Sequence, residues 1–232
     1  MSDNEHNLII AAQAKATLGP LGFRRKGRSR VWLADHGFWL AVVEFKPSGF
    51  VKGTYCNVSG HWLWGFWGEL TFDFGNQRVG GFAEFSRVTF DEIKMTLKTE
   101  QVTTPEAFAT HVAEMAREAA EATERLRRKL PTPNDAAAFL LEKVESDQLS
   151  DMVAYDAAIA FGLTGDVEEA ERLLKGLLLS EASGTPLAHE RAEVAGRLLD
   201  ALNDAPAFAA EVQDLIDRQR DALNLPPYQL QP

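Results

Sequence analysis

Residues 55–64 read YCNVSGHWLW, and side chains of two kinds alternate along this stretch. The positions of one parity are mostly apolar, and those of the other parity mostly carry polar groups. The first set is Cys56, Val58, Gly60, Trp62 and Trp64, and the second set is Tyr55, Asn57, Ser59 and His61. Because successive side chains of a strand point to opposite faces of a sheet, this alternation predicts a strand with one buried and one polar face.

The residues before and after this strand predict further strands joined by short turns. The segment 23–33 has a cationic residue at every second position from 24 to 30, and the segment 38–46 is apolar on both faces. A weaker strand is expected over 81–87. A helix is expected over 7–18, where Gly19-Pro20 stops it. The fold class is therefore predicted as α+β, with an N-terminal antiparallel meander of three or four strands and flanking helices.

After residue 104 the chain becomes rich in Ala, Leu and Glu, which predicts helices. A long helix is expected over 105–130, with Thr104 as its N-cap. Apolar faces at helical spacing then recur over 152–163, 167–180, 187–202 and 208–223, as in an all-α domain of helical hairpins. We expect an α+β domain over 1–130 that includes the long helix, a helical-hairpin domain over 131–225 and a disordered tail over 226–232.

Charge and cysteine content restrict the class of protein. The net charge is −10, and it is divided unevenly: residues 1–100 carry 12 Lys and Arg against 10 Asp and Glu, and the remainder carries 12 against 24. An acidic chain is a poor general binder of nucleic acids or anionic membranes. The single cysteine, Cys56, rules out an intramolecular disulfide. With no apolar stretch long enough to span a bilayer, the sequence predicts a cytoplasmic protein with no membrane segment.

The front part of the chain resembles a known family. The run LGFRRKGRSRVWL over 21–33, followed by WLAVVEFKPS and TYCNVSG, is similar to the family called domain of unknown function 4304. The matching positions are Gly22, Phe23, Arg24, Lys26, Phe45, Lys46, Ser48, Tyr55 and Asn57. The resemblance covers about residues 5 to 100 and implies a fold but no chemistry. The later hairpins resemble tetratricopeptide-like repeats, because they recur at roughly 35 residues.

Two polar rows are candidate ligand-binding surfaces. The first is the basic row Arg24, Lys26, Arg28 and Arg30, and the second is the polar row Glu44, Asn57, Ser59 and His61. The basic row could be the solvated face of an edge strand, could dock on the acidic half of the chain, or could track the phosphates of a single-stranded nucleic acid. In the polar row, Ser59 and His61 point in parallel on one strand, which disfavours a nucleophile and base pair.

These observations favour a non-catalytic binding or adaptor protein, with a ligand surface on the sheet and a helical module that binds a protein partner. One alternative is an enzyme of unassigned chemistry with a site around His61. A second alternative is a single-stranded nucleic-acid binder acting through residues 24–30, although the overall charge disfavours nucleic acid. The five histidines show no metal-ligand spacing, so neither a metal nor a cofactor is expected.

Overall fold

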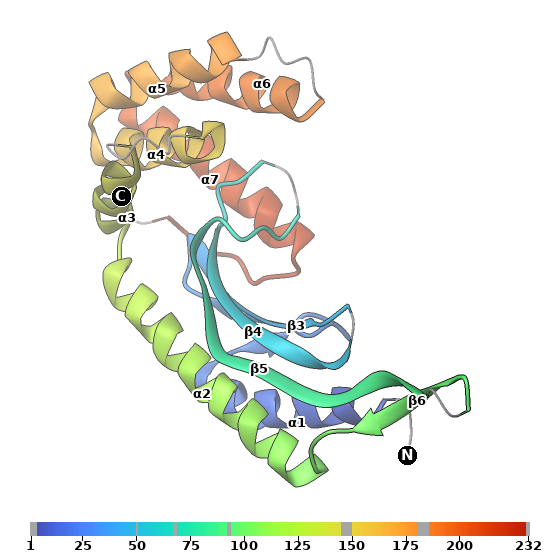
Figure 1. Ribbon diagram of the computed structural model, residues 1–232. Helices are drawn as coiled ribbons and strands as arrows, with labels where there is room; N and C mark the ends of the chain where they lie inside the picture. The colour runs from blue at the N-terminus through green and yellow to red at the C-terminus, as the bar shows by residue number, and fades with distance from the viewer. Residues whose placement is uncertain are drawn as a thin grey trace. The chain divides into compact units, whose positions relative to one another are not determined.

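The computed structural model describes residues 4–49, 51–66, 69–91, 94–144, 150–180 and 186–230. It confirms an α+β fold in which an antiparallel sheet is followed by helices (Figure 1). The chain divides into two compact units. The first unit holds residues up to 35 together with 40–61 and 72–126, and the second unit holds 36–39, 62–71 and the chain from 127 onward.

The sheet of the first unit has six strands in the order β1-β2-β3-β4-β5-β6, so each strand pairs with its neighbour in the sequence. The strands are β1 (Arg24–Arg25), β2 (Val31–Asp35), β3 (Trp39–Pro47), β4 (Val51–Trp62), β5 (Phe74–Asp91) and β6 (Thr96–Gln101). The meander is thus longer than the three or four strands predicted. The expected strand over 81–87 is the centre of an 18-residue strand, and β6 was not predicted.

The segment 23–33 is a hairpin and not the single strand that was predicted. Only Arg24 and Arg25 form β1, and the chain turns back through residues 26–30 into β2. Gly27 adopts a φ of 55°, a left-handed conformation that glycine reaches without the steric penalty of a Cβ atom. Arg25 supports the turn, because its Nε donates to the Ser29 carbonyl at 2.6 Å.

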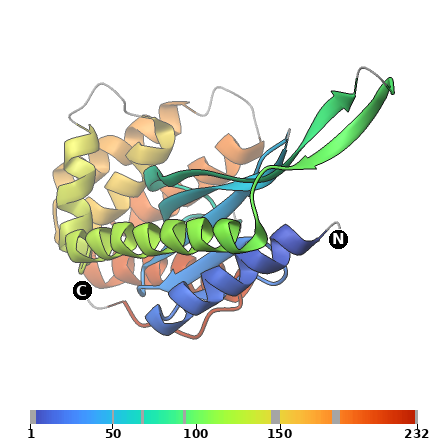
Figure 2. The ribbon, with the colours of Figure 1, turned by 60° about the horizontal axis from the view of Figure 1, so that its bottom comes forward.

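Helices α1 (Glu5–Leu18) and α2 (Pro105–Lys129) run along the sheet in the first unit (Figure 2). Phe85 of β5 contacts both of them, since its ring lies 5.1 Å from Phe108 of α2 and 6.1 Å from His6 of α1. Close approach of α2 to the sheet depends on Gly80, where a Cβ atom would come within 2.5 Å of Met115. The two helices therefore cover the same face of the sheet.

In its described residues the second unit contains five helices, and the last four match the segments predicted from helical periodicity. The five helices are α3 (Pro133–Val144), α4 (Asp151–Thr164), α5 (Val167–Ser180), α6 (Pro186–Ala201) and α7 (Ala205–Ala222). Asp166 caps the start of α5, because its carboxylate accepts from the Glu169 N–H at 3.3 Å. None of the described helices has the length and apolar character that a bilayer crossing requires.

Residues 62–67 form a tryptophan-rich stretch, and its described part belongs to the core of the second unit. The rings of Trp62 and Trp64 stack with centroids 4.7 Å apart, and Phe38 stacks on Trp64 at 5.5 Å. Helix α4 satisfies the polar groups of this cluster: Asp156 accepts from the Trp64 indole N–H at 3.1 Å, and the Tyr155 hydroxyl donates to the Trp64 carbonyl at 3.0 Å. These aromatic residues are thus buried among helices. Trp67, part of the same stretch, lies outside the described residues.

The tail is ordered as far as residue 230, which corrects the prediction of a disordered tail over 226–232. Leu230 is buried, and its N–H donates to the Gln213 side-chain oxygen at 2.7 Å. Arg220 donates to the Pro226 carbonyl at 2.6 Å and to the Gly37 carbonyl at 2.7 Å. The tail packs against α7, because both Pro226 and Leu230 have hydrogen-bond partners on that helix. Residues 231–232 lie outside the described part.

Candidate functional site

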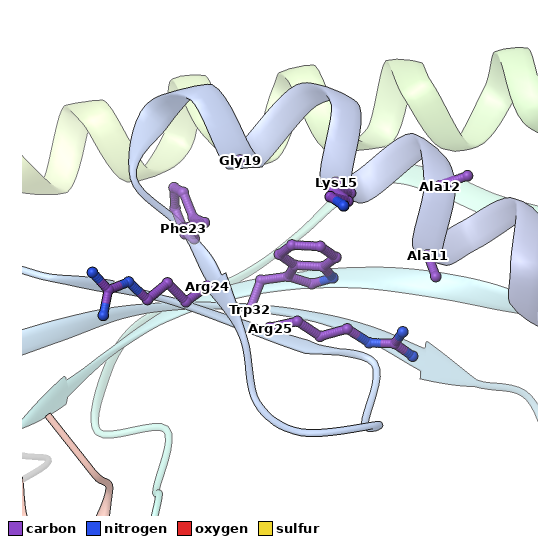
Figure 3. Close-up of a pocket in the computed structure, with 8 residues that line it drawn as sticks. All are labelled: Ala11, Ala12, Lys15, Gly19, Phe23, Arg24, Arg25 and Trp32. Carbon is purple, nitrogen blue, oxygen red and sulfur yellow. The ribbon is translucent and has the colours of Figure 1, made fainter.

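A surface pocket of about 580 Å³ lies in the first unit, between helix α1 and the β1–β2 hairpin (Figure 3). The local sequence explains its shape. Gly19 and Pro20 end α1 in a short 3-10 turn, Gly22 follows with a φ of 86°, and the Phe23 N–H donates back to the Leu18 carbonyl. This reversal brings the hairpin alongside the helix that precedes it. The pocket is the space between the two.

Aromatic and small side chains form the apolar part of the pocket. Trp32 comes from β2, Phe23 from the segment before β1, and Ala11 and Ala12 from α1. Figure 3 shows the Trp32 ring rising from the strand toward α1, below Lys15. Trp32 and Phe23 are largely buried, with 4% and 6% of their surface exposed, so each contributes only a small apolar area to the pocket. A flat apolar group fits such a surface better than a branched one.

Three cationic side chains complete the lining: Lys15 from α1, and Arg24 and Arg25 from β1. All three are exposed. Arg25 pairs directly with Trp32 across the hairpin, so both side chains share one face of the sheet. The lining residues include no carboxylate. The pocket therefore combines an apolar floor with a positively charged rim.

The positive charge extends beyond the pocket, over the whole segment that forms α1 and the β1–β2 hairpin. Within residues 4–35 there are six Lys and Arg residues and two Asp and Glu residues, Glu5 and Asp35. The whole chain is acidic, so the α1 and hairpin region stands out as locally cationic. A local positive potential attracts anions even when the net charge has the opposite sign.

The four residues of the basic row do not lie side by side on a strand. Arg24 is in β1, whereas Lys26, Arg28 and Arg30 lie in the turn. Lys26 and Arg28 are exposed. Arg30 is half-buried and donates to the Asn7 side chain on α1. Burial is the main cause that lowers the Arg30 pKa, and the charge of Arg25 adds to it. Of the four, only Arg24 lines the pocket, and the evenly spaced row needed to track a phosphate backbone is absent.

The polar row is divided between the surface and the interior. Glu44 and Asn57 are half-buried, and the Asn57 amide donates to the Glu44 carboxylate at 3.3 Å. Asn57 lies directly opposite Arg78 of β5, and Arg78 stacks over the Tyr55 ring at 4.0 Å. These residues form a small polar cluster on the sheet. Glu44 was grouped with Asn57 in the predicted polar row, and these two side chains do lie side by side.

Ser59 and His61 are fully buried, so they do not continue this surface. The His61 Nδ1 atom lies 3.0 Å from the Asp73 carboxylate, whose side chain is also buried. The Ser59 hydroxyl has no hydrogen-bond partner among the described residues. The two side chains that a hydrolytic site would couple are therefore not joined. The His61 and Asp73 pair ties the end of β4 to the segment before β5.

Cys56 of β4 is a fully buried free thiol. The Cys56 pKa is raised to about 12, mainly by desolvation and to a smaller extent by the negative charges of Glu118 and Glu44. Since the thiolate is the reactive form, the folded protein keeps this group unreactive at neutral pH. Within the described ranges, no group of three or more His, Cys, Asp or Glu side chains is placed to hold a metal ion.

The chain matches no family model, no curated protein and no solved structure. The resemblances to domain of unknown function 4304 and to tetratricopeptide-like repeats therefore stay predictions. The pocket is defined by this structure alone.

Of the eight residues that line the pocket, only Arg24 was predicted from the sequence, and the residues that were missed include Lys15, Phe23, Arg25 and Trp32. Read as one strand, the segment 23–33 puts Arg25 and Trp32 on opposite faces, because their positions have opposite parity. The hairpin places them directly across from each other. The available signal was Gly27 among cationic residues, since glycine flanked by polar residues often marks a turn.

Proposed function

We propose that the chain is a non-catalytic binding protein whose pocket beside α1 takes a small ligand with a flat apolar body and one anionic group. The observation that carries the proposal is the pairing of the Trp32 and Phe23 floor with the cations Lys15, Arg24 and Arg25 in one pocket. The apolar floor would hold the body of the ligand, and the cations would orient its charge.

The size of the pocket supports a metabolite-sized ligand. Its volume of about 580 Å³ lies within the range of about 300–1,000 Å³ that is usual for small-molecule sites. Lys15 and Arg24 are the cations best suited to the ligand, because within the described part of the chain neither side chain donates to a backbone carbonyl. Arg25 has a second role, since its Nε and Nη2 atoms donate to the Ser29 and Arg28 carbonyls.

A matched pair of fluorescent probes tests the proposal on the full chain. Anilinonaphthalene sulfonate carries an anionic group on an aromatic body, and N-phenylnaphthylamine has the same body without the charge. We expect the sulfonate to bind the wild-type chain more tightly than the neutral probe. Its dissociation constant should rise about 2- to 10-fold in Lys15→Gln and again in Lys15→Gln/Arg24→Gln, because each change removes one charge that faces the anion.

Arg28→Gln is the matched control, since Arg28 is an exposed cation of the same hairpin that does not line the pocket. It should leave the binding of both probes unchanged. A second variant, Ala12→Phe, fills the pocket from α1 and should weaken both probes. Equal affinity for the two probes, or equal effects of Lys15→Gln and Arg28→Gln, would contradict the proposal. The predicted binding of a protein partner by the helices of the second unit stays a separate prediction.

A further inference from the structure

The two edges of the sheet differ in how they are protected. At one edge, β1 is only two residues long, and a short strand offers little to a new neighbour. At the other edge, β6 presents six consecutive exposed residues. Beyond β3 and β4, strands β5 and β6 continue as a two-stranded arm (Figure 2). The outer side of β6 is therefore an open strand edge.

The pairing of β6 with β5 identifies which backbone groups face outward. The Val102 N–H donates to the Phe85 carbonyl, and the Lys98 carbonyl accepts from the Thr89 hydroxyl, so both positions are directed toward β5. Backbone groups alternate in direction along an antiparallel strand. The N–H and C=O groups of Leu97, Thr99 and Gln101 consequently point away from β5, toward the open edge.

We propose that this edge is a homodimer interface, in which β6 pairs antiparallel with β6 of a second copy about a two-fold axis at Thr99. In this register Thr99 exchanges both backbone hydrogen bonds with Thr99 of the second copy, and Leu97 pairs with Gln101. The outward N–H and C=O groups of one copy then meet those of the other copy along the whole strand. A continuous sheet across the two copies results.

Charge complementarity selects this register over its two nearest alternatives. With the axis at Thr99, Lys98 lies directly opposite Glu100 of the second copy, and the symmetry makes this pair twice. An axis at Lys98 would place Lys98 against itself, and an axis at Glu100 would place Glu100 against itself. Like charges directly opposite each other destabilise a strand pair, whereas opposite charges stabilise it. Since Lys98 and Glu100 form non-hydrogen-bonded pairs in the proposed register, their side chains would lie at the closer spacing.

The face of the arm that does not carry Lys98 and Glu100 also supports the proposed dimer interface. Val88 lies opposite Thr99 in the pairing of β5 with β6, so Val88, Thr99 and Leu97 share one face. Val88 is 55% exposed and Leu97 is 76% exposed. In the dimer, Leu97 would lie beside Gln101 and diagonal to Thr99 of the second copy, which covers part of its apolar surface.

Sedimentation velocity of the full chain over a concentration series tests the proposal. We expect a reversible shift from the 25.6 kDa monomer to a dimer. The affinity should be weak, because a single six-residue strand buries less than the roughly 800 Å² per partner of a standard interface. Lys98→Glu should weaken the dimer on the order of 10- to 100-fold, and the charge exchange Lys98→Glu/Glu100→Lys should restore it.

Two further variants separate the edge from general effects of charge and folding. Thr99→Pro removes an outward N–H that takes no part in pairing with β5, so the chain should fold and stay monomeric. Lys46→Glu makes the same charge reversal on an exposed residue of β3 and should leave the dimer intact. A wild-type chain that stays monomeric throughout would overturn the proposal. So would a dimer that survives Thr99→Pro, or one that Lys98→Glu breaks and the charge exchange fails to restore.

Discussion

The neighbouring glycines Gly80 and Gly81 of β5 offer a matched test of how α2 packs on the sheet. Both have a positive φ, 65° and 68°. A Cβ atom at Gly80 would lie 2.5 Å from the Met115 Cγ atom and 3.0 Å from its Cα atom, whereas at Gly81 it would meet nothing within 4 Å. Substituting alanine at each position therefore adds the same backbone strain, but only Gly80→Ala also pushes against α2.

The expected magnitudes follow from these two effects. A left-handed conformation costs an L-residue about 1–2 kcal/mol, so Gly81→Ala should lower the free energy of unfolding by that amount. Forcing a methyl group into a packed contact costs a further 1–3 kcal/mol or so. Gly80→Ala should thus lower the free energy of unfolding by about 2–5 kcal/mol in total.

Urea unfolding of both variants, followed by far-UV circular dichroism, measures this difference. The Met115 backbone atom near Gly80 belongs to a helix and cannot rotate away as a flexible side chain could. We therefore expect Gly80→Ala to be the less stable variant by about 1–3 kcal/mol. If the two variants had the same stability, the close contact between α2 and β5 would be refuted.

Three other changes test separate parts of the structure. Asp156→Ala should destabilise the chain by about 1–3 kcal/mol in urea, because the buried Trp64 N–H loses its acceptor; an unchanged midpoint would contradict this. Cys56 should resist a thiol reagent until the chain unfolds, and since its folded pKa of about 12 is raised, its stabilising contribution should be lost as pH rises from about 8.5 toward that value. The loss of stability over this range should be smaller in Cys56→Val than in wild type. Leu230→Ala should lower the free energy of unfolding by about 1–3 kcal/mol, whereas a disordered tail would give no change.

The helices were predictable from sequence, because periodicity and capping act within one element. The side chain of the predicted N-cap Thr104 accepts the Ala107 N–H, and the helical segments after residue 150 agree closely with the prediction. The predicted alternation of buried and more exposed positions also holds over residues 55–58 of β4. These features depend on local geometry alone.

The errors arose where distant segments decide the environment of a residue. From Ser59 onward both faces of β4 are buried, and the buried His61 is partnered by Asp73 from the segment before β5. Alternation in the sequence carries no information on these partners. Likewise, β6 is exposed at every position and has too little apolar character to be recognised as a strand.

The candidate pocket could be anticipated only in part. Arg24 was identified from its charge, but the location of the pocket depends on the reversal at Gly22 and on the turn at Gly27, which place Trp32 next to α1. A single-strand interpretation of 23–33 assigns every residue of β2 to the wrong face relative to β1, because the hairpin pairs odd positions with even ones. The aromatic floor of the pocket could therefore not be predicted without knowing that this segment forms a hairpin.

The most direct test of the proposed ligand site is a titration of the isotope-labelled chain with anilinonaphthalene sulfonate, observed in amide and indole NMR spectra. The shifted signals should be those of Ala11, Ala12 and Lys15 on α1 and of Gly19 just after it, together with the indole N–H of Trp32. Shifts that map instead to the smaller pocket at Pro131–Asn134 in the second unit, or no shifts at all, would contradict the proposed ligand site.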